Sequence, residues 1–341
     1  MQLEDFDFAL PQELIARYPL AKRSASRLLC VEKTGSVKHR QFDEVIDCIE
    51  SGDLLVFNDT KVIPARLYGH KSTGGQVEVL IERVLDRSRI LAQLRASKPP
   101  HIGDSIFFPR EFHLEVCGRH NQFYELQYQD DDVSVLKMIE SIGQIPLPPY
   151  MQREAEEDDI ARYQTVYAKH KGSVAAPTAG FHFDEELLQK LRDKQVEMGY
   201  LTLHIGAGTF TPIRVANVAE HKMHAEYLEV SEKLCDQIAR TKARGKRVIC
   251  VGTTSMRALE TASQGGVIAP YAGETSIYIY PGYTFRCADA LITNLHLPRS
   301  SLLILVCAFG GYRAVMDAYQ AAITNHYRFY SYGDAMWVNA A

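Results

Sequence analysis

Six short segments of alternating apolar and polar residues lie between positions 65 and 128, and short turns, with no helix pattern, separate them. The segments are 66–71, 76–83, 89–94, 105–108, 113–119 and 123–128. Strands at such even spacing, with no room for crossover helices, pair with their neighbours in an antiparallel sheet that closes on itself. This part of the chain therefore predicts a small antiparallel β-barrel.

On both sides of this block, strand patterns alternate with helix patterns. We expect strands at 54–57, 200–204, 247–251, 276–280, 290–293 and 335–338, and helices at 163–167, 185–194, 232–244, 256–263 and from the cap Ser300 through Phe309. Such alternation indicates a mixed or parallel sheet, or an open barrel, covered by helices. The predicted fold is an α/β main domain of residues 1–64 and 146–341, with a small antiparallel β-barrel inserted at 65–145.

The composition predicts a cytoplasmic protein without a membrane partner. The seven cysteines are scattered and never form a C-x-x-C pair, which argues against disulfides and cysteine-based metal sites. The longest apolar run, 302–309, is too short to cross a bilayer. The formal net charge of −4 argues against wholesale coating of nucleic acid but allows a local basic patch.

The segment GSVAAPTAGFHF at 172–183 consists almost entirely of small residues and ends in two aromatic rings. A ligand can approach the main chain of such a segment directly, and Gly180 is free to adopt a positive φ. Phe181 and Phe183 offer flat faces to a nucleobase or a cation. Asp184 is the predicted N-cap of the next helix. The alternative is a tight strand–turn–helix connection whose small residues only permit close packing.

Two further turns of the same kind follow apolar runs: LHIGAGTF at 203–210 and VGTTSMRALE at 251–260. Three such turns predict loops gathered at one end of a sheet, where α/β proteins bind ligands. Hydroxyls at 253–255 and Arg257 one turn later form a candidate anion site at a helix start, for a phosphate or a carboxylate. A plain helix cap explains the same residues.

Histidines and basic residues with aromatic neighbours supply the other candidates. HKMHAE at 221–226 resembles an incomplete zinc motif, but no third ligand run is evident, so we expect no metal and favour a His–Glu pair with a proton-transfer role. His204 and His296, taken singly, favour structural roles. The stretch HYRFY at 326–330 is the best candidate for RNA contact, because its rings can stack beside a guanidinium.

Ten motifs stand in the order in which one family carries them. They are GDLLVFNDTKVIPARL at 52–67, RASKP at 95–99, IPLPPY at 145–150, YQTVY at 163–167, AAPTAGFHF at 175–183, LHIGAGTF at 203–210, GTTSMR at 252–257, YPG at 280–282, NLHLP at 294–298 and FYSYGDA at 329–335. On these motifs the chain resembles, over nearly its whole length, the S-adenosylmethionine:tRNA ribosyltransferase-isomerases of queuosine biosynthesis. The resemblance also implies an α/β domain with an inserted β-barrel.

The resemblance implies an activity with two substrates. The ribosyl portion of S-adenosylmethionine moves onto 7-aminomethyl-7-deazaguanine at the wobble position of a tRNA, adenine and methionine leave, and epoxyqueuosine-tRNA is formed. S-adenosylmethionine is consumed, so no cofactor is expected. A small-molecule α/β enzyme without an RNA partner and a non-catalytic RNA-binding protein are the competing interpretations; the barrel with its basic-aromatic tail argues against the first, and the three ligand-type turns against the second.

Roles follow from the resemblance as hypotheses. Because the sulfonium acidifies the adjacent ribose carbon, Glu226 is expected to act as base or as countercharge, with His224 beside it and His182 and His204 as rivals. The residues expected to hold the nucleoside are Pro177, Thr178, Ala179, Gly180, Gly206, Gly208 and Thr209, with Phe181, Phe183 or Phe210 against adenine. Thr253, Thr254, Ser255 and Arg257 are expected to hold the methionine carboxylate or a tRNA phosphate. The expected tRNA contacts are Lys61, Arg66, Arg95, Lys98, His296, Arg328, Tyr330 and Tyr332.

Overall fold

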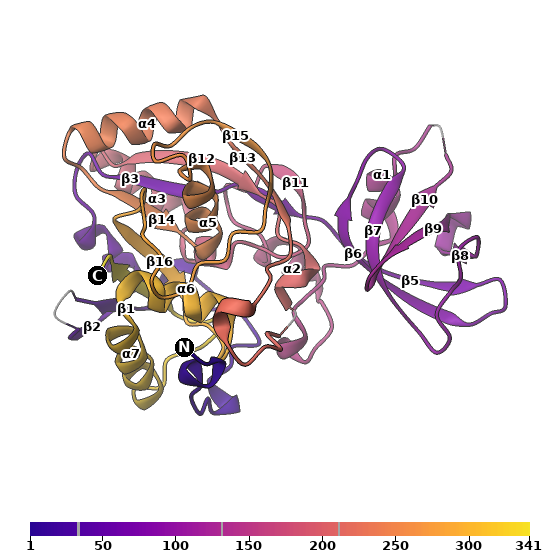
Figure 1. Ribbon diagram of the computed structural model, residues 1–341, viewed down its shortest axis with the longest axis horizontal. Helices are drawn as coiled ribbons and strands as arrows, with labels where there is room; N and C mark the ends of the chain where they lie inside the picture. Colours follow the sequence, from indigo (N-terminus) through magenta and orange to yellow (C-terminus); the bar gives the residue numbers. More distant parts are fainter. Residues whose placement is uncertain (33–34, 131, 211) are drawn as a thin grey trace.

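The computed structural model describes residues 1–32, 35–130, 132–210 and 212–341, with Phe210 described through its backbone alone. Its largest part is a nine-stranded mixed sheet with helices on both faces (Figure 1). In order across the sheet the strands are β15 (Tyr271–Thr275), β13 (Glu226–Val230), β12 (Glu197–Leu203), β3 (Leu54–Asn58), β14 (Val248–Val251), β16 (Ala290–Asn294), β17 (Ala335–Asn339), β1 (Arg27–Val31) and β2 (Val37–Gln41). The four central strands β12, β3, β14 and β16 run parallel.

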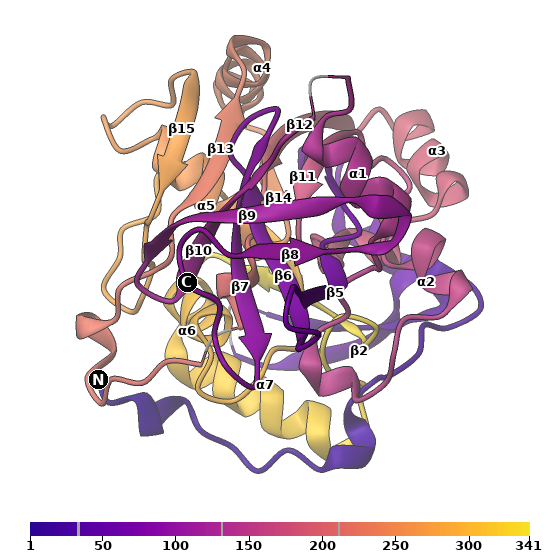
Figure 2. The ribbon, with the colours of Figure 1, turned by 90° about the vertical axis from the view of Figure 1, so that its right-hand side faces the viewer.

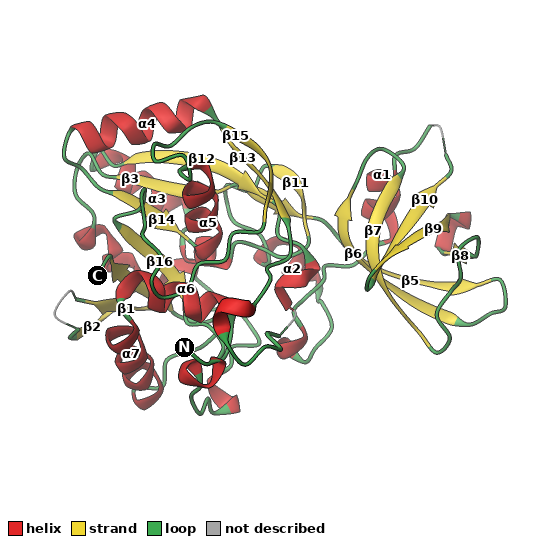
Figure 3. Cartoon of the chain, viewed as in Figure 1, coloured by secondary structure: helices red, strands yellow, loops and turns green. Residues whose placement is uncertain are grey.

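Alternate residues of the central strands pack into two separate layers of helices (Figure 3). One face is covered by α4 (Glu232–Ala243), α5 (Thr253–Ala262), α6 (Ser301–Gly310) and α7 (Tyr312–Thr324). The other face is covered by α3 (Glu185–Asp193) and the 3₁₀ helix η4 (Phe42–Cys48). Buried on both faces, the central strands carry near-continuous apolar runs, as in Leu54-Leu55-Val56-Phe57.

The block of six alternating segments forms a closed antiparallel barrel, as predicted. Around the barrel the strands are β10 (Phe123–Tyr128), β7 (Arg89–Ala96), β6 (Gln76–Val84), β5 (Arg66–Lys71), β8 (Ser105–Phe107) and β9 (His113–His120). Helix α1 (Val135–Ile142) adds Val135, Met138 and Ile139 to the barrel core. The barrel projects from one end of the helix-covered sheet and lies in front of it in the perpendicular view (Figures 1 and 2).

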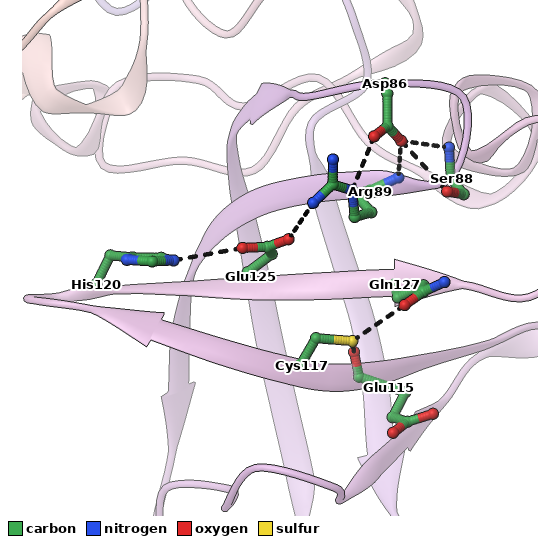
Figure 4. A network of polar contacts seen from close by, with 8 residues as sticks. All are labelled: Asp86, Ser88, Arg89, Glu115, Cys117, His120, Glu125 and Gln127. Carbon is green, nitrogen blue, oxygen red and sulfur yellow. Dashed lines mark hydrogen bonds and ion pairs between the residues drawn. The ribbon is translucent and has the colours of Figure 1, made fainter.

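A surface network on the barrel ties its turns together (Figure 4). Arg89 bridges Asp86 in the preceding turn and Glu125 on β10, each at 2.8 Å, and His120 approaches the same Glu125 at 3.3 Å. Apart from the partly buried Glu125, these side chains are well exposed to solvent, and exposed ion pairs each contribute only about 0–1 kcal/mol. The network therefore supports the local strand arrangement and carries no sign of a binding site.

Four short strands at the domain junction and the sheet edge escaped the sequence analysis. β4 (Thr60–Val62) and β11 (His170–Ser173) form a small parallel sheet, and β13 and β15 extend the large sheet. The expected strand at 276–280 is instead an extended loop, and the expected helix at 163–167 is a turn that follows α2 (Glu157–Arg162). The strand prediction is wrong because local apolar periodicity does not reveal which segment has a neighbouring strand to pair with. The helix prediction is wrong because a five-residue segment is too short to show a helical period.

Three other expectations concern thiols, membranes and metals. All seven cysteines are free thiols. Among the described residues no single helix has the length and apolar character needed to cross a membrane; α6 and α7 meet that test only as a pair, bent by 119° at their junction. The part of the chain that the structure describes contains no group of three or more His, Cys, Asp or Glu side chains placed to hold a metal ion.

Candidate active site

A cavity of about 590 Å³ lies where β12, β14 and β16 end, at the carboxyl edge of the parallel strands. This edge is the usual ligand site of an open α/β sheet. The three turns singled out in the sequence all contribute to its wall, with Ala179, Gly208 and Thr253 as one representative of each. The turns are far apart in the chain. Two of them follow β12 and β14 of the large sheet, whereas the third follows β11 of the small sheet and contacts the end of β16.

The small-residue segment supplies one wall through Pro177, Thr178 and Ala179, where the 3₁₀ helix η7 (Thr178–His182) begins. Thr178 donates a hydrogen bond from Oγ1 to Oδ1 of Asn294 at 3.0 Å, which ties this wall to the end of β16. Gly180, which was predicted to contact the nucleoside, does not line the cavity, and it does not use the positive φ that is open to it. It is needed for close packing, because a Cβ there would lie 2.0 Å from the hydroxyl oxygen of Tyr167.

A buried ion pair forms the charged part of the cavity. Arg257, one turn into α5, donates from Nη1 to Oε2 of Glu226, the first residue of β13. The two residues are only 5% and 7% exposed, and both line the cavity. Arg257 also donates from Nε to the carbonyl oxygen of Ile277 at 3.3 Å. Among the described residues its buried Nη2 has no hydrogen-bond partner, so this donor is available to a ligand.

The start of α5 lies beside this pair. Thr253 and Thr254 line the cavity, and Gly252 just before them has a φ of 91°, which favours glycine. Thr254 is held by the buried Asn58, whose Nδ2 donates to Oγ1 at 3.3 Å. Ser255 does not face the cavity: it is fully buried and donates to the carbonyl of Val251 at 2.8 Å. We therefore withdraw Ser255 from the proposed ligand contacts.

The turn at 206–209 is clamped from outside the cavity by the barrel. The backbone N–H of Gly208 donates to Oε2 of Glu82 on β6 at 3.1 Å, and a Cβ on Gly206 would lie 2.1 Å from Oε1 of the same carboxyl. On the cavity side, a Cβ on Gly208 would lie 2.7 Å from the ring of His224. Gly208 and Thr209 line the cavity, whereas Gly206 packs behind it, which corrects its predicted ligand contact.

Comparisons with known proteins agree with this architecture. A family model described as "Queuosine biosynthesis protein" matches residues 3–338. The chain belongs to this family. It is 54% identical over 336 residues to the S-adenosylmethionine:tRNA ribosyltransferase-isomerase of Coxiella burnetii, with 98% of each chain covered, and 53% identical over 342 residues to that of Nitrosococcus oceani, with 100% of this chain and 99% of the relative covered.

A solved structure shows the same fold. The S-adenosylmethionine tRNA ribosyltransferase of Thermotoga maritima is 34% identical, covers 98% of this chain and 99% of its own, and superposes with a TM-score of 0.56. The resemblance noted in the sequence is thereby confirmed, and the chain is an enzyme of the ribosyltransferase-isomerase family.

Of the histidines proposed for catalysis in this ribosyltransferase-isomerase, only His224 lines the cavity. His182 is buried between Ser26 Oγ, 2.7 Å from Nδ1, and Asn294 Nδ2, 3.2 Å from Nε2; its burial lowers its pKa to about 3. His204 contacts Oγ1 of Thr60 at 2.7 Å, and burial lowers its pKa as well. Both rings serve as neutral hydrogen-bonding groups away from the cavity, so neither is retained as a candidate base.

The rings expected against adenine also lie elsewhere. Phe183 is fully buried between Phe42 and Phe57 in the core on the α3 face, with ring centroids 5.1 and 5.2 Å away. Phe181 packs edge-on against Tyr163 at 5.6 Å and is 6% exposed. Neither ring lines the cavity, because the 3₁₀ helix η7 directs the chain from the cavity wall at Thr178 into the protein core. The prediction for Phe210 falls on a side chain outside the described residues.

The residues expected to contact tRNA fall into two groups. Lys61 lies on β4, Arg66 pairs with Glu78 at 3.5 Å, and Arg95 and Lys98 are exposed on or beside β7 of the barrel. The second group follows α7 or β16: Arg328 donates to the carbonyl of Tyr18, and Tyr332 donates to Asp159 at 2.9 Å in a buried contact. Tyr330 and His296 line the cavity itself.

Tyr330 is stacked on Tyr150, with ring centroids 4.0 Å apart, and both rings line the cavity. His296 lies within 2.8 Å of Oγ1 of Thr293 through Nε2, and burial lowers its pKa to about 3. Burial therefore favours the neutral ring, and Thr293 occupies its Nε2, which argues against the predicted phosphate contact. Tyr332, which was predicted to contact RNA, is buried and bonded to Asp159, so this prediction is corrected as well.

Sequence reasoning missed several residues of the site. His221 and Met223 line the cavity next to His224, and Asn294 joins two of its walls. His221 and Met223 belong to the HKMHAE motif, but the sequence analysis assigned roles only to His224 and Glu226 of that motif. The sequence gives no indication that Glu82 belongs to the site, because polar residues that face outward are expected at alternate positions of a barrel strand.

Proposed function

We propose that the chain transfers and isomerises the ribosyl moiety of S-adenosylmethionine onto 7-aminomethyl-7-deazaguanine at the wobble position of tRNA, which gives epoxyqueuosine-tRNA, adenine and methionine. The observation that carries the proposal is the convergence of three small-residue turns on one cavity that contains the buried Glu226–Arg257 pair. The volume of about 590 Å³ suits a nucleoside with an amino-acid arm, since ligand sites of this size class range over roughly 300–1,000 Å³.

The methionine carboxylate is assigned to the start of α5. Thr253 and Thr254 present their backbone N–H groups at a helix N-terminus, which favours an anion, and the free Nη2 of Arg257 adds a charged donor beside them. A carboxylate there would accept from Nη2, the nitrogen of Arg257 that has no hydrogen-bond partner among the described residues. The alternative anion, a tRNA phosphate, would need to enter the same buried corner.

Glu226 is assigned to the reacting end of the ligand. Its carboxylate is the acidic group in the cavity wall, and Arg257 fixes its orientation through Oε2. We assign it the proton at the ribose carbon next to the sulfonium, whose positive charge a carboxylate also stabilises. His224 lies next to it in the same wall and is assigned to the exchange of protons with the departing groups.

The tRNA is assigned to the side of the cavity that carries the stacked Tyr150 and Tyr330. An exposed or flipped base can stack on such rings, while Arg328 on the adjoining segment supplies positive charge to the backbone. We further propose that residues 65–145 act as an inserted domain with its own core, and that the enzyme works in the cytoplasm, where its tRNA substrate is found.

Free adenine provides a direct test. Purified enzyme, S-adenosylmethionine and tRNA that carries the aminomethyl-deazaguanine are incubated, and adenine and the modified base are followed by chromatography. We expect both products from the complete mixture and neither when that base is unmodified guanine. Adenine release without modification of the tRNA would refute the transfer. Glu226→Gln should retain most S-adenosylmethionine binding but lose turnover, and unchanged turnover would remove Glu226 from the reaction.

The anion assignment has its own test. Arg257→Met should weaken S-adenosylmethionine binding by ~1.5–3 kcal/mol, the range of a charge-assisted hydrogen bond. Methylthioadenosine has no methionine carboxylate and no sulfonium, so its affinity should change much less. If the variant instead loses only tRNA affinity, with a shallower dependence on salt, Arg257 contacts a phosphate and the carboxylate assignment is wrong.

A further inference from the structure

Glu82 comes from the inserted barrel but faces the main domain. The pairing of β6 with β7 shifts register at this point: Ile81 pairs with Ala92 and Arg83 pairs with Leu91, which leaves Glu82 as the extra residue of a β-bulge. Bulges redirect a side chain and are common beside active sites. Glu82 is nevertheless only 6% exposed, unlike an ordinary outward-facing residue of a barrel strand.

The carboxyl group of Glu82 contacts the turn at 206–209 from the side opposite the ligand cavity. Oε2 accepts the N–H of Gly208 at 3.1 Å, and Oε1 occupies the space that a side chain on residue 206 would need. Gly208 in turn lies directly against the His224 ring. One layer of main chain therefore separates Glu82 from the cavity wall that holds His224 and Glu226.

The surroundings of Glu82 make its charge unusually sensitive. Its burial, and to a smaller extent the nearby Glu226 carboxylate, raise its pKa to about 7, while the amides of Gly208 and Ala207 oppose this rise. Other titratable or charged groups lie on the elements packed around Glu82. They are two ion pairs, Arg83 (β6) with Glu274 (β15) and Arg66 (β5) with Glu78 (β6), together with His170 and Lys171 on β11 and His224 on the other side of the turn.

We propose that Glu82 is a positioning residue of the ribosyltransferase-isomerase, through which the inserted barrel holds the 206–209 turn in place and contributes negative charge behind the site of the sulfonium. The inference rests on the proposed function, because it takes the positive sulfur to lie near Glu226. Glu82 itself does not touch the ligand. The barrel is thus part of the active site's electrostatics.

Thermodynamic reciprocity turns this geometry into a measurable quantity. A cation bound near Glu82 favours its ionised form, so ionised Glu82 must favour the cation by the same factor. S-adenosylmethionine should therefore bind more tightly as the pH rises through the pKa of Glu82, about 7. S-adenosylhomocysteine has the same adenosine, amino and carboxylate groups but a neutral sulfur, so it lacks this component.

The experiment measures the affinities of both ligands by calorimetry between about pH 6 and about pH 8.5. For the wild type we expect Kd for S-adenosylmethionine to fall roughly three- to tenfold across this range relative to S-adenosylhomocysteine, which corresponds to a coupling of up to about one pKa unit. Glu82→Gln keeps an oxygen acceptor for Gly208 but cannot ionise, and should abolish the difference. Glu78→Gln, on the same strand and paired with Arg66, should behave as the wild type.

Three results would overturn the inference. Equal pH slopes for the two ligands in the wild-type enzyme would do so without any variant, which covers the case that Glu82→Gln does not fold. A difference that persists in Glu82→Gln but disappears in His224→Asn would assign the effect to the histidine. Lack of S-adenosylmethionine binding at every pH would refute the proposed function and this inference together, whereas tight but pH-independent binding refutes the inference alone.

Discussion

The buried Glu226–Arg257 pair should be energetically coupled, and its disruption has a predictable cost. Arg257→Met fills much of the same volume but leaves the Glu226 carboxylate without its partner in a site where both residues are less than a tenth exposed. Removing one partner of a buried pair typically costs about 3–5 kcal/mol of folding free energy. Glu226→Gln should cost less, about 1–3 kcal/mol, because Arg257 keeps its contact with the Ile277 carbonyl and gains a neutral amide acceptor.

The double variant provides the decisive comparison. With both charges gone, no unpaired ion remains, so the combined loss should be about 1–3 kcal/mol smaller than the sum of the two single losses. Urea unfolding can be followed by the fluorescence of Trp337, the only tryptophan in the chain, which is buried on β17 of the same sheet. Additive losses would show that the two side chains do not stabilise one another, and the reasoning about the cavity would fail.

Three further predictions follow from other contacts. The pKa of Glu82 is about 7 in the folded protein and 4.5 in the unfolded chain, so the folded state binds more protons between these two pH values and its stability falls as pH rises through this window. Glu82→Gln should remove up to about 3 kcal/mol of that loss when the free energy of unfolding is measured by urea titration at several pH values. The same pH dependence of stability in the wild type and the variant would contradict this. Gly208→Ala places a Cβ 2.7 Å from His224 and should lower kcat roughly tenfold or more. Gly265 has open space around it, so Gly265→Ala should leave kcat unchanged, and an equal kcat in the two variants would contradict the packing argument. Arg328→Ala should weaken tRNA binding in gel shifts and lower the salt slope by about one, and an unchanged slope would exclude a phosphate contact.

Local patterning predicted the barrel correctly because each of its strands repeats the same alternation beside a clear turn. It failed at the edge of the large sheet. The run SIYIY at 276–280 alternates as a strand should, but β15 ends at Thr275, and the run continues as a loop whose Ile277 carbonyl binds Arg257. β13 alternates between buried and exposed residues in the structure, but its first buried residue is the charged Glu226, so its sequence does not show a regular apolar alternation.

The candidate site shows the same division. The small residues at 175–179, 206–209 and 252–254 were recognisable because a ligand-bearing turn needs bare main chain, and the structure brings all three to one cavity. The roles of single side chains were less accessible. Phe183 and His182 look available in sequence but are core residues, since the chain turns inward immediately after Ala179.

By itself, the sequence determined the classes of structure present: a barrel within an α/β protein, its family, and the turns where ligands can approach the backbone. These are local properties, set by periodicity, residue size and helix-capping chemistry. Only the tertiary structure decided which charges meet. Arg257 finds Glu226 across the sheet edge, and Glu82 reaches the glycine turn from another domain. Each of these two pairs joins residues more than 30 positions apart in the chain. They depend on strand order and on the bulge at Glu82, so neither pair leaves a local trace in the sequence.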